Sequence, residues 1–141
     1  MINFSEILKD ANWNKEESAK PEAVQKLVDD AGKELPKDYL DLLLYCNGGE
    51  GELGIKPGWF RLWSAEDVIQ FNKDYEVEKY VPEFFGFGSS GGGELIAIDM
   101  QKDKSRKIVM IPFVSMSPDE ARVITNDFEE FVKAIGRRFD Y

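Results

Sequence analysis

The spacing of apolar residues predicts two long helices in the first third of the chain. Pro21 suits the first turn of a helix, and the apolar positions after it recur every three or four residues until Gly32. A second helix is predicted from about Pro36, with an apolar stripe that runs to residue 44. The glycines of Asn47-Gly48-Gly49 permit a left-handed cap, so we expect this helix to stop there.

Shorter helices are predicted in three other places. One covers about residues 3–9. Another begins at Ser64, because Ser64 and Asp67 resemble a capping box, and its apolar positions extend to Tyr75. The last begins near Asn126, with Glu129 three residues later and a strongly apolar face behind it.

Strands are predicted where apolar residues alternate or run together between turn residues. The predicted strands are residues 53–56, 59–63, 83–87, 94–100 and 107–111. Alternation within 94–100 predicts a strand with one apolar face. Residues 101–106 are predicted as a polar connection, and residues 115–125 give no assignable element. Helices first, strands later and a final helix are typical of an α+β protein.

Length and charge narrow the class of protein. A chain of 141 residues has the length of one ordinary domain, so we predict a single domain over residues 1–141. The chain has 18 basic and 27 acidic residues, a formal net charge of −9. This charge repels phosphate backbones and therefore disfavours direct nucleic-acid binding. It fits either a basic protein partner, whose capture complementary charge speeds, or solubility alone.

Catalytic chemistry has few candidate residues in this sequence. There is no histidine, which excludes Ser-His-Asp and Cys-His mechanisms and removes the usual zinc ligand sets. The single cysteine, Cys46, lies in an apolar run, and we interpret it as a buried core residue. We therefore predict a protein that is not an enzyme and that needs no cofactor and no metal. A hydrolase that uses two carboxylates is the enzymatic alternative.

The sequence gives no sign of export or membrane insertion. Its first six residues lack the basic and apolar stretches of a signal peptide, and no apolar run approaches the ~20 residues of a membrane span. We therefore expect a cytoplasmic protein with no membrane partner.

Three segments invite comparison with binding loops. Residues 88–93 are rich in glycine, but a strand follows them, whereas a phosphate loop opens a helix, so we interpret them as a hairpin loop. Residues 47–52 carry two carboxylates without the spacing of a calcium-binding EF-hand, and we interpret them as an exposed acidic loop. The basic cluster at 102–107 is interpreted as a solvated strand connection.

Aromatic residues beside carboxylates are the best candidates for protein binding. Trp59 and Trp63 share one face of their predicted strand, and Phe60 points to the other. One face belongs to the core, and the other is either covered by a helix or free to bind a partner. The acidic stretch 74–83 contains two tyrosines, and it is either a surface for a basic partner or a solvated helix end.

Several short motifs occur in an order that resembles one protein family. They are Leu35-Pro36-x-x-Tyr39, Asn47-Gly48-Gly49, Leu62-Trp63, Asn72-x-x-Tyr75, Phe87-Gly88-Ser89, Gly91-Gly92-Gly93-Glu94 with a strand that ends at Asp99, and Asp127-Phe128-Glu129-Glu130-Phe131. Over roughly residues 34–139, the chain resembles the SUKH superfamily, in particular the branch that includes fungal cell-wall assembly regulators. The resemblance implies a SUKH-like fold: a mostly antiparallel sheet flanked by N-terminal, middle and C-terminal helices.

The resemblance also implies a function, by analogy of fold. Many bacterial members of the superfamily are immunity proteins, so the implied partner is a cognate toxin protein, for example one with a basic nuclease domain. The alternative is an intracellular regulatory or scaffold protein similar to the fungal relatives. We predict partner-binding residues on two segments: Glu50, Glu52 and Trp59 at one edge, and Ser90 and Glu94 beside the glycine turn.

Overall fold

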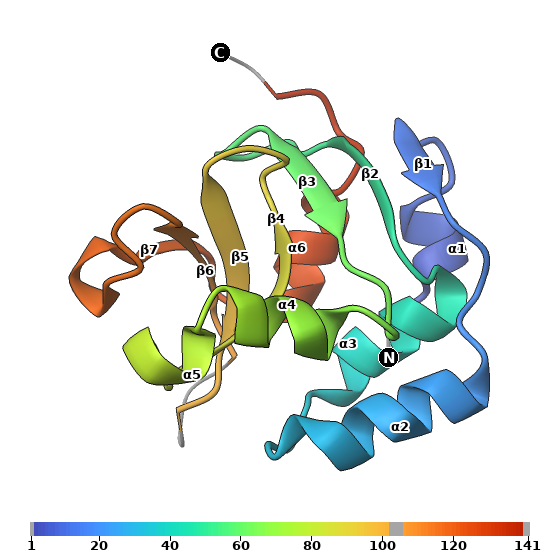
Figure 1. Ribbon diagram of the computed structural model, residues 1–141. Helices are drawn as coiled ribbons and strands as arrows, with labels where there is room; N and C mark the ends of the chain where they lie inside the picture. Colours follow the sequence, from blue (N-terminus) through green and yellow to red (C-terminus); the bar gives the residue numbers. More distant parts are fainter. Residues whose placement is uncertain (1, 102–105, 140–141) are drawn as a thin grey trace.

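Seven strands within the described residues, 2–101 and 106–139 of the computed structural model, form one antiparallel sheet in chain order (Figure 1). The strands are β1 (Trp13–Lys15), β2 (Gly49–Glu52), β3 (Trp59–Leu62), β4 (Phe84–Ser89), β5 (Glu94–Asp99), β6 (Ile108–Pro112) and β7 (Arg122–Thr125). The helices are α1 (Phe4–Ile7), α2 (Pro21–Ala31), α3 (Lys37–Tyr45), α4 (Val68–Asp74), α5 (Val77–Tyr80) and α6 (Phe128–Ala134), with a short 3-10 helix at Pro118–Glu120. The predicted α+β class and antiparallel sheet are confirmed.

The ends of α2 and α6 follow local sequence signals. Pro21 occupies the first position of α2, and Gly32 ends that helix with a left-handed φ of 67°. Helix α6 is capped by Asp127, one residue after the start predicted near Asn126. The Asp127 carboxylate accepts a hydrogen bond from the backbone N–H of Glu130 at 2.8 Å, which satisfies a free amide of the first helical turn.

The segment after α3 differs from the prediction. The helix ends at Tyr45, and its cap residue, Cys46, has an extended backbone and not a left-handed one. The strand predicted at residues 53–56 lies earlier, at β2, where it pairs with both β1 and β3. Residues 49–52 therefore belong to the sheet and do not form the exposed loop that we expected from the glycines.

Close approach of β1 explains why β2 is a strand. A Cβ atom on Gly49 would stand 2.6 Å from the carbonyl oxygen of Asn14 and 2.9 Å from the ring of Trp13. Glycine therefore lets β1 lie against β2 where a larger residue would push it away. The pairing partner, β1, has no sequence pattern of its own and was not predicted.

Two more segments differ from the sequence prediction. All residues of β5 after Glu94 are buried, because helices cover both faces of the sheet there, so the prediction of one apolar face is wrong. Residues 115–125 contain the 3-10 helix and the edge strand β7, whose first two residues are exposed.

Within the basic cluster at 102–107, residues 102–105 lie outside the described residues.

An aromatic core fills the space between one sheet face and helices α3 and α6. Tyr39 of α3 is fully buried and meets Phe87 of β4 and Phe128 of α6 edge-on, with centroid distances of 5.6 and 6.2 Å. Phe60 of β3 meets Phe131 of α6 in the same way at 4.9 Å. Such pairs add about 0.5–1.5 kcal/mol beyond the burial of their area. The core therefore holds β3 and β4 in place. Because one face of these strands packs in the core, their alternate side chains point to the opposite side of the sheet.

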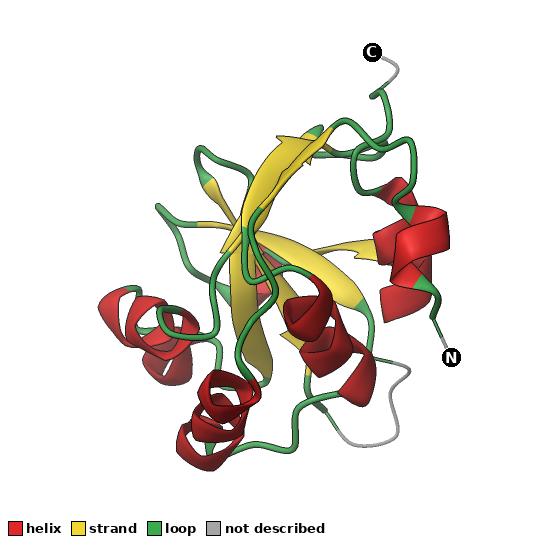
Figure 2. Cartoon of the chain, turned by 90° about the vertical axis from the view of Figure 1, so that its right-hand side faces the viewer, coloured by secondary structure: helices red, strands yellow, loops and turns green. Residues whose placement is uncertain are grey.

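Helices lie on both sides of the sheet (Figure 2). In Figure 1, α4 crosses in front of the sheet and α6 lies behind it. Helix α4 is fixed to β4 by Asn72, whose side-chain amide bonds to the backbone of Gly86 at 2.8 and 2.9 Å. Helix α2 packs against both α3 and α4 and joins the two groups of helices. The cover on the α4 side is incomplete, because Trp59 and Arg61 of β3 remain exposed there.

Candidate functional site

The outer face of β3 is covered at one end and open at the other. Trp59, Arg61 and Trp63 alternate along the chain and point to the same side. Trp63 is only 5% exposed because it packs against Phe71 of α4, with ring centroids 4.7 Å apart. Trp59 is 39% exposed. The sequence left two interpretations of this face: covered by a helix, or free to bind a partner. The structure shows a helix covering it at Trp63 and an exposed side chain at Trp59.

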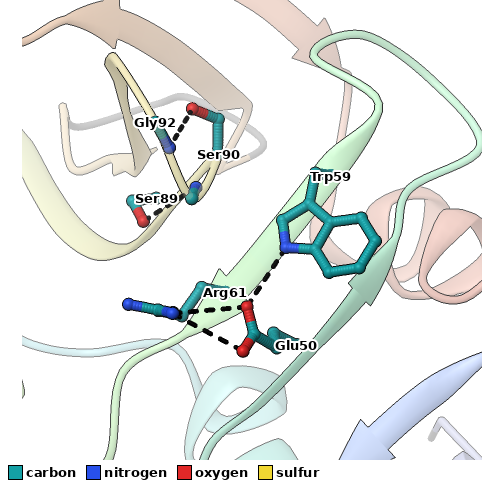
Figure 3. A network of polar contacts seen from close by, with 7 residues as sticks. Glu50, Trp59, Arg61, Ser89, Ser90 and Gly92 are labelled. Atoms are coloured by element: carbon teal, nitrogen blue, oxygen red, sulfur yellow. Dashed lines mark hydrogen bonds and ion pairs between the residues drawn. The ribbon is translucent and has the colours of Figure 1, made fainter.

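Glu50 connects the side chains of this exposed surface (Figure 3). Its carboxylate accepts a hydrogen bond from the indole Nε1–H of Trp59 at 3.2 Å. The Arg61 guanidinium pairs with the same carboxylate, at Nη2–oxygen distances of 3.4 and 3.5 Å. Glu50 lies opposite Arg61 in the register of β2 and β3, so the three side chains share one face of the sheet.

Glu52 lies next to this network. It is paired with Trp59 in the register of β2 and β3, and its carboxylate accepts a hydrogen bond from the side-chain amide of Asn12 at 3.1 Å. Glu52 therefore faces the same side as Glu50. The structure brings together all three residues that were predicted at this edge.

The glycine turn between β4 and β5 lies against the Trp59 ring. A Cβ atom on Gly91 would stand 2.8 Å from Cδ1 of the indole, so glycine is needed for this approach. Gly91 also has a φ of +78°, a backbone conformation that other residues adopt only with strain. The turn that carries Ser90 and Glu94 therefore lies against Trp59, although the two segments are separate in the sequence.

Ser90 and Glu94 hold the turn together. The Ser90 hydroxyl donates to the Glu94 carboxylate at 2.7 Å and accepts from the backbone N–H groups of Gly92 and Glu94 at 3.2 Å. The Ser89 hydroxyl accepts from the backbone N–H of Gly91 at 3.1 Å (Figure 3). These bonds shape the turn that contacts Trp59. The predicted role of Ser90 and Glu94 in partner binding stays a prediction.

An open groove of about 1010 Å³ lies beside the network. Its lining includes Glu50, Arg61 and Ser89 from the sheet and the aromatic rings of Trp63 and Tyr75. Among its described lining residues, five carboxylates face two cations: Glu16, Glu17, Glu50, Glu66 and Asp67 against Lys20 and Arg61. The groove therefore presents a negatively charged surface next to an exposed tryptophan.

Asn47 fixes one wall of the groove. Its side-chain amide donates to the Glu66 carboxylate at 2.7 Å, and its side-chain oxygen accepts from the backbone N–H of Ala65 at 2.7 Å. These bonds join the loop after α3 to the loop before α4. The Asn47-Gly48-Gly49 motif therefore positions the groove, in addition to its place at the end of a helix.

The acidic stretch 74–83 divides between the groove and the solvent. The Tyr75 ring stacks on Trp63 at 6.0 Å and on Phe113 at 4.2 Å, and the residue remains partly exposed where it lines the groove. Tyr80 is exposed on α5, outside the groove lining. Tyr75 is thus the residue of this stretch that belongs to the candidate site.

Two titratable groups of the core are held in their neutral forms. Burial raises the pKa of the Cys46 thiol to about 11, so the thiol stays protonated at neutral pH. Burial also raises the pKa of the Tyr39 hydroxyl well above its ordinary value.

Within residues 2–101 and 106–139, no group of three or more His, Cys, Asp or Glu residues suits a metal ion. The charged, polar and aromatic residues that line the groove can form ion pairs, hydrogen bonds and stacking contacts.

Comparison with known families agrees with this architecture. The sequence pattern of the SMI1/KNR4 family (SUKH-1) matches residues 18–134, which include both strands of the Glu50 network and the glycine turn. The chain belongs to the SMI1/KNR4 family. The resemblance to the SUKH superfamily is confirmed, and its members are generally non-enzymatic immunity or regulatory proteins. A comparison with curated proteins gives no match. In the part of the chain that the structure describes, no helix is long and apolar enough to cross a membrane.

Sequence reasoning misses two residues that shape the site of this SUKH-1 protein. Arg61 has the same strand parity as Trp59 and Trp63, so the alternation contains a signal that could have found it. Asn47 has no comparable signal as a site residue, because its bond to Glu66 joins positions 19 residues apart. Only the folded chain shows that contact.

Proposed function

We propose that this SUKH-1 protein is an immunity protein that binds a toxin domain and neutralises it by direct protein–protein contact. The observation that supports the proposal is the exposed Trp59 side chain, which bonds to Glu50 and packs against the glycine turn beside the groove. Tryptophans of this kind are frequent anchors of protein interfaces. The proposed partner-binding residues are Glu50, Glu52, Trp59, Ser90 and Glu94.

A basic nuclease domain is the form of toxin that the charge of the chain favours. The net charge of −9 and the acidic groove complement a surface that is built to bind phosphate. Complementary charge speeds the encounter of two proteins and helps to select the partner. The contact itself would block the toxin's active site, so neutralisation requires no cofactor. We place this encounter in the cytoplasm.

Calorimetry with the product of the gene immediately upstream tests the proposal. The toxin's catalytic domain is titrated at low and at high salt, and its activity is measured in the mixture. A nanomolar complex that abolishes the activity supports immunity, and a loss of affinity at high salt supports the role of charge. A tight complex whose affinity does not change with salt would support immunity and contradict the role of charge.

The absence of binding to this gene product would contradict immunity against it. The regulatory alternative, which family membership also supports, would then take precedence. A pull-down from host lysate with wild-type protein and a Trp59→Ala variant would follow, and a partner lost only with the variant would support regulation through the same surface.

A further inference from the structure

The ion pair between Glu50 and Arg61 has the features of an exchangeable contact. The shortest nitrogen–oxygen distance is 3.4 Å, and the side chains of Arg61 and Glu50 are 56% and 39% exposed. Strong charge-assisted bonds are shorter, at about 2.7–2.9 Å. An exposed pair of this kind contributes about 0–1 kcal/mol, because water screens the charges. Arg61 can therefore leave Glu50 without a large loss of stability.

Arg61 also opposes the charge of its surroundings. The groove beside it has five carboxylates among its described lining residues, and Lys20 is the other cation of that set. Arg61 thus lowers the negative potential at the centre of the exposed sheet face. Trp59 holds the Glu50 carboxylate from a different direction, through its indole N–H, so the carboxylate keeps one fixed partner when Arg61 moves.

We infer that Arg61 pairs with Glu50 in the free protein, and that a cationic side chain of the partner replaces Arg61 at Glu50 in the complex. The inference rests on the proposed function of this surface in partner binding. The occupant is a basic polypeptide segment of the partner protein, and one of its arginine or lysine side chains pairs with Glu50 while Arg61 turns to the solvent. Charge complementarity selects this occupant, since the groove repels an acidic one. Arg61 therefore lowers the affinity for the partner by competing for Glu50, and the Glu50 carboxylate raises that affinity by pairing with the partner's cation.

A nona-arginine peptide is a direct probe of this exchange. Its binding is measured by fluorescence anisotropy of a label on the peptide, with the protein variants Glu50→Gln and Arg61→Gln. The chain offers a matched pair of controls on α6, Glu129→Gln and Lys133→Gln, because these two residues form an exposed ion pair at 3.3 Å and do not line the groove. Each control changes the net charge by the same amount as the variant it accompanies.

The two substitutions are expected to act in opposite directions. Glu50→Gln weakens peptide binding about tenfold relative to Glu129→Gln, because the receiving carboxylate is lost. Arg61→Gln strengthens binding about threefold relative to Lys133→Gln, because the competing cation is lost. Bound peptide is also expected to shield Trp59 from quenching by acrylamide, and the change in quenching should disappear in Trp59→Phe.

The sign of the Arg61→Gln effect decides the inference. Weaker binding by Arg61→Gln than by Lys133→Gln would overturn it, and so would equal effects of Glu50→Gln and Glu129→Gln. Arg61→Gln removes only an exposed side chain, so this variant remains informative even where Glu50→Gln loses its fold.

An assay of toxin neutralisation distinguishes a failure of this inference from a failure of the proposed function. Equal neutralisation by the wild type and by Glu50→Gln would contradict the exchange and leave immunity in place. Failure of the wild type to bind the toxin domain would contradict immunity, and the peptide result would still decide whether the surface receives cationic segments.

Discussion

The hydroxyl of Tyr39 is buried between aromatic rings, and it has no hydrogen-bond partner among the described residues. Desolvation of an unpaired polar group opposes folding by about 1–3 kcal/mol. Tyr39→Phe is therefore expected to raise the free energy of unfolding by about 1 kcal/mol, measured by urea unfolding. Tyr80→Phe, at an exposed position, is the control and should change it by less than about 0.5 kcal/mol. A lower unfolding free energy for Tyr39→Phe would show that the hydroxyl is bonded.

Cys46 makes stability depend on pH in the alkaline range. Burial raises its pKa from 9.0 to about 11, so between these values the unfolded chain loses the thiol proton while the folded chain keeps it. The contribution to stability is complete below pH 9 and is lost as the pH approaches 11. One such group lowers the unfolding free energy by about 1.4 kcal/mol per pH unit within that window.

The measurement is urea unfolding of the wild type and of Cys46→Ala from pH 8 to pH 11. The wild type is expected to lose stability more steeply than the variant above pH 9. Tyr39 also favours the neutral form when folded, so both proteins carry its alkaline slope, and the difference between them reports Cys46. Parallel curves for the two proteins would contradict this assignment.

At the scale of elements, local signals explain what could be predicted. Helices α2 and α6 have regular apolar spacing and recognisable first residues, so their existence follows from patterns within a few turns. Strand β2 has no such pattern, because Gly49–Glu52 becomes a strand through its pairing with β1 and β3. The same limit applies to the candidate site: Trp59 and Glu50 were predictable as surface candidates, but the approach of Gly91 to Trp59 depends on the folded sheet.

The glycine turn provides a matched test at this scale. Gly91→Ala places a Cβ atom against the Trp59 indole at a positive φ, whereas nothing lies within 4 Å of a Cβ atom on Gly93. Gly91→Ala is expected to lower the free energy of unfolding by about 1–2 kcal/mol and to weaken partner binding, because the turn moves away from Trp59. Gly93→Ala should change both by little. Thermal unfolding and calorimetry measure the two effects, and equal results for the two variants would contradict the close packing of the turn.

At the scale of the whole molecule, net charge should control the rate of partner capture. Raising the ionic strength from about 50 to about 500 mM screens charge beyond a few ångströms. The association rate with the toxin domain is expected to fall about tenfold, while the dissociation rate changes little, because long-range attraction acts before contact. Surface plasmon resonance at several salt concentrations measures both rates. An association rate that is independent of salt would mean that the charge of −9 serves solubility alone.

The central claim is that the exposed sheet face around Trp59 binds the partner, and one comparison of variants tests it most directly. Trp59 and Val123 are both large exposed apolar residues, but Trp59 bonds to Glu50 from β3, whereas Val123 lies on the edge strand β7 at the end of the sheet. The measurement is the affinity of Trp59→Ala and Val123→Ala for the toxin domain, with the thermal midpoint of each. We predict that Trp59→Ala weakens binding at least about 30-fold at a temperature where the thermal midpoint shows the variant to be fully folded, and that Val123→Ala binds like the wild type. Normal binding by Trp59→Ala, or a greater loss in Val123→Ala, would contradict the claim and move the interface away from this face.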